Sequence, residues 1–197
     1  MTENSLSLYD DIQCRYFNKP GPGNTRAVME IVSRRAKELA IKNILVATCS
    51  GRTVFEALEV LGPEVKIIAV THVTGFQKPN HQELSSETRK QLESKGVSVL
   101  TCQHAFGGVG RAVRNKLATF QVDEIMAYTL RTFGEGTKVA VELALMAADA
   151  GLVRTDEDVI SIGGTGKGAD TALVLQSANS FHFFDLKVKE IICKPTL

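Results

Sequence analysis

In this chain of 197 residues, the strongest indication of the fold lies in residues 43–53, Asn43 to Thr53, which read NILVATCSGRT. Their run of branched apolar residues predicts a buried strand that stops at small hydroxyl and glycine positions. Apolar residues then recur at helical spacing, at Val54, Phe55, Ala57, Leu58 and Leu61. The segment therefore predicts a strand that leads through a tight turn into the N-terminus of a helix.

Such a turn is suited to holding an anion. The backbone N–H groups of a first helical turn lack internal partners and lie at the positive end of the helix dipole. Ser50 and Thr53 add hydroxyl groups, and Gly51 eases the turn. A simple helix cap by Ser50 is the alternative, but a cap has no use for Arg52, whereas a phosphate gains charge-assisted bonds from it. We therefore expect Ser50, Gly51, Arg52 and Thr53 to bind a phosphate.

The composition excludes several classes of partner. Lys and Arg total 23 against 22 Asp and Glu, a net charge of +1, so no broad field favours nucleic acid or an anionic membrane surface. No apolar run approaches the ~20 residues that span a bilayer. Four scattered cysteines without a C-x-x-C pair, and no N-terminal signal, indicate a reduced, cytoplasmic protein.

Strands and helices alternate along the chain, which predicts an α/β fold with parallel strands and right-handed crossovers. We expect an N-terminal arm over residues 1–23, ending at a Pro-Gly-Pro-Gly breaker, and one α/β domain over residues 24–197. Strands are predicted at 44–48, 65–71, 97–102, 158–162, 171–175 and 187–193, the last two as a hairpin or antiparallel edge. Helices are predicted at 24–40, up to 61, at 83–95, and over 109–150 with breaks near Gln121 and Gly134.

Four of these strands end in residues capable of chemistry, and the carboxyl ends of parallel strands share one edge of a sheet. Besides the Ser50 turn, the candidates are His72 and Thr74, then His104 with Gly107, Gly108 and Gly110, and finally Gly163, Gly164 and Thr165. Either histidine could be a hydrogen-bonded residue at a strand end, or could bind a phosphate or move protons as a catalytic acid and base. The glycines could form flexible loops, or let the backbone approach a ligand closely.

Two nucleotide motifs fail at the loop over residues 163–168. A P-loop would need glycine at Ser161 and a hydroxyl residue at Gly168. A Rossmann fingerprint could be forced from Gly164, Gly166 and Ala169, with Asp185 downstream. The residues after it read as a strand, however, and the chain that remains is too short for a βαβ unit and the rest of the sheet.

The remaining cysteines and charged residues are not expected to form a reactive or metal-binding site. Cys49 and Cys102 lie at the same predicted edge and are expected to be packed thiols rather than reactive ones. No group of His and Cys has metal-ligand spacing in the sequence, so no protein-bound metal is expected. The pattern of Glu135, Lys138 and Glu142 is typical of a solvated helix face.

The residues that follow the first strand resemble a known family. Thr48 to Thr53, followed by residues 67–71, is similar to the C-terminal domain of pyruvate kinase, where a Ser-Gly-Arg loop holds a phosphate of the sugar bisphosphate activator in some members. Over nearly its whole length the chain resembles the stand-alone prokaryotic proteins named for that α/β domain. The shared segments include Tyr16 and Phe17, Asn24 and Thr25, residues 72–76, 108–111, 147–152, 162–165 and 168–175.

The resemblance implies a three-layer fold, with a mainly parallel five-stranded sheet, helices on both faces and an antiparallel edge strand. It does not imply kinase activity, because the catalytic site of pyruvate kinase lies in a barrel domain without counterpart here. It also implies a phosphorylated ligand that is nucleotide-like or flavin-like, with flavin mononucleotide (FMN) as the first candidate.

Three functions remain open at this stage. The leading one is a binding domain for a phosphorylated small molecule. The rivals are an enzyme at the same edge, either a flavin-dependent oxidoreductase or a phosphosugar-converting enzyme using His72 or His104, and a regulatory module acting on another protein. A homo-oligomer is also expected, because the N-terminal arm carries aromatic residues.

Overall fold

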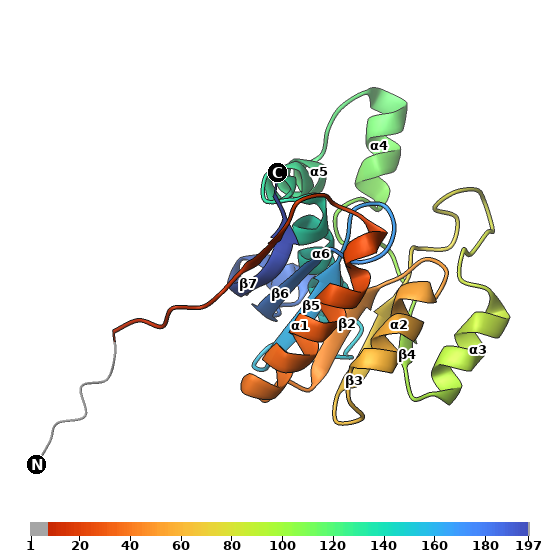
Figure 1. The fold of residues 1–197 in the computed structure, drawn as a ribbon. Coiled ribbons are helices and arrows are strands. Elements are labelled where there is room, and N and C mark those ends of the chain that lie inside the picture. The colour runs from red at the N-terminus through yellow and green to blue at the C-terminus, as the bar shows by residue number, and fades with distance from the viewer. Residues whose placement is uncertain (1–7, 197) are drawn as a thin grey trace, which may run out of the picture.

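The computed structural model describes residues 8–196 and shows three layers, with a sheet between two sets of helices (Figure 1). The strands are β1 (Arg15–Phe17), β2 (Asn43–Ala47), β3 (Lys66–Val70), β4 (Ser98–Leu100), β5 (Asp158–Gly163), β6 (Thr171–Gln176) and β7 (Lys187–Pro195). The helices are α1 (Thr25–Glu38), α2 (Arg52–Val60), α3 (Ser86–Ser94), α4 (Val109–Leu117), α5 (Val122–Arg131) and α6 (Glu135–Asp149). Two 3-10 helices, η1 (Pro22–Asn24) and η2 (Ser180–Asp185), complete the fold.

The sheet has seven strands in the order β1-β7-β6-β5-β2-β3-β4. Only β6 is antiparallel to its neighbours, so the predicted mainly parallel sheet and the antiparallel pair of β6 and β7 are confirmed. The count of five strands is wrong, because the sheet continues beyond the reversed strand β6 with both β7 and β1, which are parallel to each other. β6 therefore lies toward one side of the sheet, with two parallel strands outside it.

Side chains that alternate along β2 divide the core between the two faces of the sheet. Ile44 and Val46 pack in the cluster formed with α1 and α2, whereas Leu45 packs in the cluster formed with α6. This alternation is the period of two expected of a strand that is buried on both sides. The three-layer architecture with helices on both faces is thus confirmed.

The segment before α1 is more involved in the fold than an arm over residues 1–23 implies. Residues 1–7 of that arm lie outside the described part of the chain. Residues 8–14 run away from the body as an extended segment (Figure 1), and then Arg15–Phe17 adds a strand to the sheet as β1. The inner end of the predicted arm is therefore an edge strand of the domain.

The charged face of α6 is buried, contrary to the prediction from the sequence. Lys138 and Glu142 of α6 are only 4 % and 5 % exposed, so their face of the helix is not solvated. The two side chains form an ion pair with each other, and the Glu142 carboxylate accepts a hydrogen bond of 2.9 Å from the Phe106 amide. Burial is tolerated because each charge finds its partner within the core.

The helices of residues 8–196 are either too short or too polar for any of them to cross a lipid bilayer.

Candidate functional site

Four turns lie together at the carboxyl edge of the sheet. β5, β2, β3 and β4 are adjacent and mutually parallel, so the segments that leave them start at the same edge. The predicted gathering of these four turns on one edge is therefore confirmed by the topology. The four turns differ in how their polar groups are satisfied.

The turn after β2 leaves backbone donors free. Gly51 adopts a left-handed conformation, with φ of 88°, and its amide donates to the Thr48 hydroxyl at 2.9 Å. The next two amides, of Arg52 and Thr53, have no hydrogen-bond partner among residues 8–196. Both point out of the first turn of α2, where the helix dipole favours negative charge. This turn can therefore donate to an anion.

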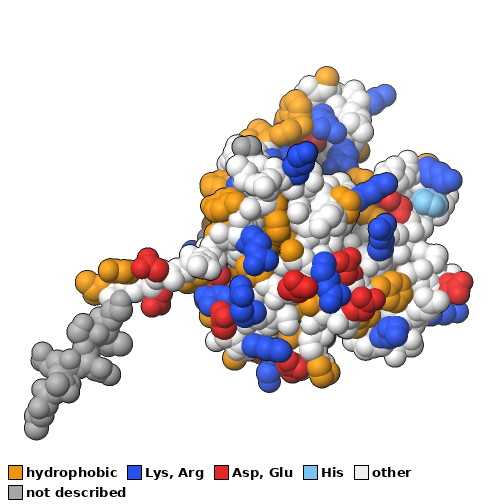
Figure 2. Space-filling view, viewed as in Figure 1, with side chains coloured by type: hydrophobic (Ala, Val, Ile, Leu, Met, Phe, Trp, Pro, Cys, Tyr) orange, Lys and Arg blue, Asp and Glu red, His pale blue; other side chains and the backbone are white. Residues whose placement is uncertain are grey.

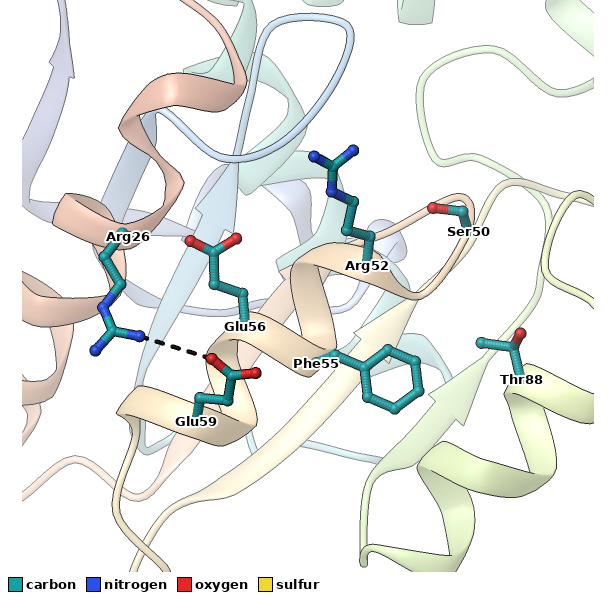
Figure 3. A pocket seen from close by; sticks show the side chains of 7 residues that line it. All are labelled: Arg26, Ser50, Arg52, Phe55, Glu56, Glu59 and Thr88. Atoms are coloured by element: carbon teal, nitrogen blue, oxygen red, sulfur yellow. Dashed lines mark ion pairs between the residues drawn. The ribbon is translucent and has the colours of Figure 1, made fainter.

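Side chains around this turn form an open depression with a volume of about 440 Å³ (Figure 3). Ser50 and Arg52 are exposed, whereas Thr53 is buried and contributes its backbone more than its hydroxyl. Arg52 makes no ion pair within the described residues, although Glu56 follows on the same side of α2 in Figure 3. Arg26, across the depression, is instead paired with Glu59 at 3.7 Å. Arg52 is thus the cation left available to a ligand here.

The loop after β5 holds a buried carboxylate among its own donors. The Asp170 side chain is fully buried and accepts bonds from the amides of Thr165, at 3.1 Å, and Gly21, at 3.0 Å. The Ala169 amide donates to the Thr25 hydroxyl, at 3.0 Å. The Thr165 amide, which was predicted to bind a phosphate, therefore donates its hydrogen bond to the carboxylate of Asp170 instead.

Glycines of this loop are explained by close packing. A Cβ on Gly163 would collide with the Gly136 carbonyl oxygen of α6, and one on Gly164 would collide with the Gly168 carbonyl oxygen. These glycines let β5 and α6 approach each other and let the loop fold back. Their presence therefore needs no ligand.

His72 and His104 come together with their ring centroids 5.4 Å apart. Phe76 lies against both rings, at 4.1 Å from His72 and 5.2 Å from His104. The Arg111 guanidinium lies 5.3 Å from the Phe76 ring. The turns after β3 and β4 thus build one aromatic cluster, while Thr74, which is exposed, accepts a bond of 3.4 Å from Gln82.

The two histidines have different environments. His104 Nε2 accepts the Val73 amide at 3.3 Å, which requires that nitrogen to be unprotonated. Burial lowers the pKa of His104, and Lys138, Arg111 and His72 add to this effect while Glu142 opposes it. His72 Nδ1 instead lies 2.6 Å from Glu83 Oε2. Of the two candidate acid–base residues, His104 therefore uses Nε2 to bind the turn after β3.

The glycines that begin α4 are also surrounded by protein. A Cβ on Gly108 would collide with the Gln103 side chain, and one on Gly110 would lie 2.6 Å from an Asp123 carboxylate oxygen. A Cβ on Gly107 would lie 2.9 Å from the Arg111 guanidinium. Side chains of the protein therefore already occupy the space beside all three glycines.

Glu83 and Cys49 join His72 in a cluster that the sequence did not reveal. Cys49 Sγ lies 3.5 Å from His72 Nδ1, and one ligand atom from each of the three residues lies within 4.8 Å of the others. Burial and, to a lesser extent, Glu83 raise the pKa of Cys49, and burial followed by Asp149 and Glu142 raises that of Cys102. Burial thus disfavours the thiolate form of both side chains.

Comparison with known proteins places this α/β domain in a family. The family model for the pyruvate kinase alpha/beta domain matches residues 26–175, and the chain belongs to that family. Two similar solved structures are pyruvate kinases of Cryptosporidium parvum, one of them in complex with ADP. They share 14 % and 15 % sequence identity with TM-scores of 0.40 and 0.39. Each match covers 76 % of this chain and 22 % of the pyruvate kinase, so the chain spans about a fifth of those enzymes.

Proposed function

We propose that this domain binds a phosphorylated small molecule at the carboxyl edge of its sheet, without pyruvate kinase activity. The observation that carries the proposal is that, among residues 8–196, the amides of Arg52 and Thr53 have no hydrogen-bond partner and the Arg52 guanidinium beside them has no ion pair. A phosphate at this turn would satisfy both amides and gain charge-assisted bonds from Arg52. Ser50, which is exposed, lines the same depression (Figure 3).

FMN is the first candidate ligand. Its phosphate suits the turn after β2, and its flat ring system suits an edge that already carries the aromatic cluster of His72, Phe76 and His104. A sugar phosphate is the second candidate, because it needs the phosphate subsite but no aromatic surface. Mass spectrometry of whatever small molecule copurifies, together with the colour of the protein, distinguishes the two.

The phosphate subsite is tested by Arg52→Ala. This substitution should weaken binding of FMN, or of the sugar phosphate that raises the melting temperature, by ~1.5 to 3 kcal/mol, because charge-assisted bonds are lost. The stability of the fold should change by no more than ~0.5 kcal/mol, since Arg52 is exposed. Isothermal titration calorimetry and urea denaturation measure the two quantities.

Arg26→Ala is the matched control for that experiment. Arg26 lines the same depression but is already paired with Glu30 and Glu59. Its loss should leave the affinity nearly unchanged. Equal affinities for wild type and Arg52→Ala would remove Arg52 from the site.

A regulatory interaction module is the second candidate function, and one surface favours it. Large apolar side chains are exposed over α4, α5 and the turn between them, and orange side chains gather there at the top of Figure 2. They are Val109, Leu117, Phe120, Val122, Ile125 and Tyr128. Exposed apolar patches of this kind mark interaction surfaces. This candidate predicts no thermal shift with any phosphorylated ligand.

Of the two enzyme alternatives, the phosphosugar-converting enzyme depends on His72. Because His104 Nε2 is held by the Val73 amide, His72 is the histidine that could exchange protons at this edge. A yellow protein that is bleached by a reductant would support a flavin oxidoreductase, and loss of turnover in His72→Gln would support a phosphosugar-converting enzyme.

A further inference from the structure

Three turns bring a thiol, an imidazole and a carboxylate together at the edge of the sheet. Cys49 follows β2, His72 follows β3, and Glu83 lies shortly before α3. Sγ of Cys49 and Oε2 of Glu83 lie 3.5 Å and 2.6 Å from the same nitrogen, Nδ1 of His72. All three side chains are partly buried, so their ligand atoms are held in place but remain within reach of solvent.

These three donor types are the ones that zinc binds in proteins. Zinc bonds measure about 2.3 Å to sulfur, and about 2.0 to 2.1 Å to histidine nitrogen, so two such ligands on one tetrahedral ion lie roughly 3.5 Å apart. The separation of Sγ and Nδ1 is 3.5 Å, which already matches that spacing. The Glu83 oxygen would have to withdraw from Nδ1 by roughly 0.8 Å to reach tetrahedral spacing. A partly exposed carboxylate in a loop can make that movement.

The spacing distinguishes this cluster from a catalytic triad. In a triad the thiol and the carboxylate approach opposite nitrogens of the imidazole. Here Sγ is nearly equidistant from the two ring nitrogens, at 3.5 and 3.7 Å, and the carboxylate is on Nδ1. The arrangement therefore favours shared ligation over activation of a nucleophile.

We propose that Cys49, His72 and Glu83 form a zinc site with three protein ligands. On binding, the S–H bond of Cys49 breaks, its proton passes to solvent, and the sulfur binds the ion as a thiolate. His72 binds through Nδ1 and Glu83 through a carboxylate oxygen. This inference replaces the expectation of no metal, and it stands independently of the phosphate ligand.

Three protein ligands leave a fourth position of the tetrahedron for water or for a ligand oxygen. Cys49 directly precedes Ser50 in the chain, so the zinc site adjoins the turn that offers its amides to a phosphate. The Cys49 thiolate and the Glu83 carboxylate would balance the charge of the ion, so the zinc would offer that edge an open coordination position rather than net positive charge.

The test is a metal titration of the full chain, first stripped with a chelator. Zinc is titrated against a chromophoric competitor, and cobalt(II) is titrated separately to look for the near-ultraviolet absorption of a thiolate–cobalt bond. We expect one equivalent of either metal and a clear thiolate–cobalt band. Cys49→Ser should abolish that band, and both Cys49→Ser and His72→Ala should weaken zinc binding by at least about 100-fold, the upper range for loss of an outer-shell partner.

Two further variants keep the proposal falsifiable. Cys102→Ser removes another partly buried thiol, just after β4, and should leave zinc affinity and the cobalt band unchanged. Glu83→Gln keeps the size of the side chain and should weaken zinc binding, with circular dichroism confirming that the variant is folded. The proposal is overturned if wild type and Cys49→Ser bind zinc equally, if no thiolate–cobalt band forms, or if Cys102→Ser loses as much as Cys49→Ser.

Discussion

The turn after β2 and the loop after β5 lie at the same edge of one sheet, but they use their backbone donors differently. In the turn after β2, the amides of Arg52 and Thr53 find no partner among residues 8–196. In the loop after β5, a fully buried carboxylate, that of Asp170, accepts the Thr165 amide. A glycine-rich sequence is therefore no guide to anion binding by itself, because the acceptor can be built into the protein.

The largest expected effect tests the internal acceptor. Asp170→Ala removes the partner of the Gly21 and Thr165 amides and of the Thr171 hydroxyl, which lies at 2.9 Å. Each buried donor left unsatisfied costs about 1 to 3 kcal/mol, so the free energy of unfolding should fall by about 3 to 5 kcal/mol in urea denaturation. Asp185→Ala, at an exposed carboxylate, is the control and should change it by less than about 0.5 kcal/mol. A loss below about 1 kcal/mol for Asp170→Ala would mean that the loop does not depend on its carboxylate.

Two glycine variants, one in each of these turns, should have an effect on stability of intermediate size. Gly51 and Gly166 both have left-handed backbones, with φ of 88° and 73°, so an alanine at either position costs about 1 to 2 kcal/mol. At Gly51 the added Cβ would also lie 2.5 Å from Cγ2 of Thr88, whereas at Gly166 it meets nothing within 4 Å. Gly51→Ala should therefore destabilise the protein more, as measured by urea denaturation. Equal losses would show that α3 does not hold the turn after β2 in shape.

The smallest effect is expected in the turn after β4, where His104 makes stability depend on pH. Burial lowers the pKa of His104 below its ordinary value of 6.5, so the unfolded chain takes up a proton there more readily than the folded protein. His104 therefore contributes stability above about pH 6.5 that is lost as the pH falls. Urea denaturation at a series of pH values should show a weaker acid loss for His104→Gln, which keeps an acceptor for the Val73 amide. If the free energy of unfolding falls equally with pH in the variant and the wild type, His104 is not the source of the acid loss.

Local pattern was sufficient for most of the fold. The buried run over β2 and the helical repeat of α2 are each set by residues near one another, so their period identifies them. The same holds for the break between α5 and α6, where Gly134 has φ of 124° and begins the new helix.

What the sequence could not predict depends on distant partners. The three residues of β1 form a strand only because β7 offers an edge, and Arg15 pairs with Cys193 far along the chain. Lys138 and Glu142 have the spacing of a solvated pair, and their burial is decided by what covers α6.

In the candidate site, too, local features could be predicted from the sequence and contacts between distant residues could not. The turn from Ser50 to Thr53 could be predicted because its donors, its glycine and its arginine are consecutive. Asp170 could not, because one of its partners, Gly21, lies 149 positions away. Glu83 lies in a loop without periodicity, and its approach to His72 is visible only once the turns are folded.

The short pairing of β1 with β7 has a consequence for how copies of this molecule meet. An uncovered edge strand is a template on which another chain can add its own strand. β1 covers β7 at Cys193, Lys194 and Pro195, and the uncovered start of β7 carries Lys187 and Lys189. β1 becomes the edge strand in place of β7, and because it has only three residues it offers a neighbouring molecule few hydrogen-bonding groups, which limits strand addition from this side.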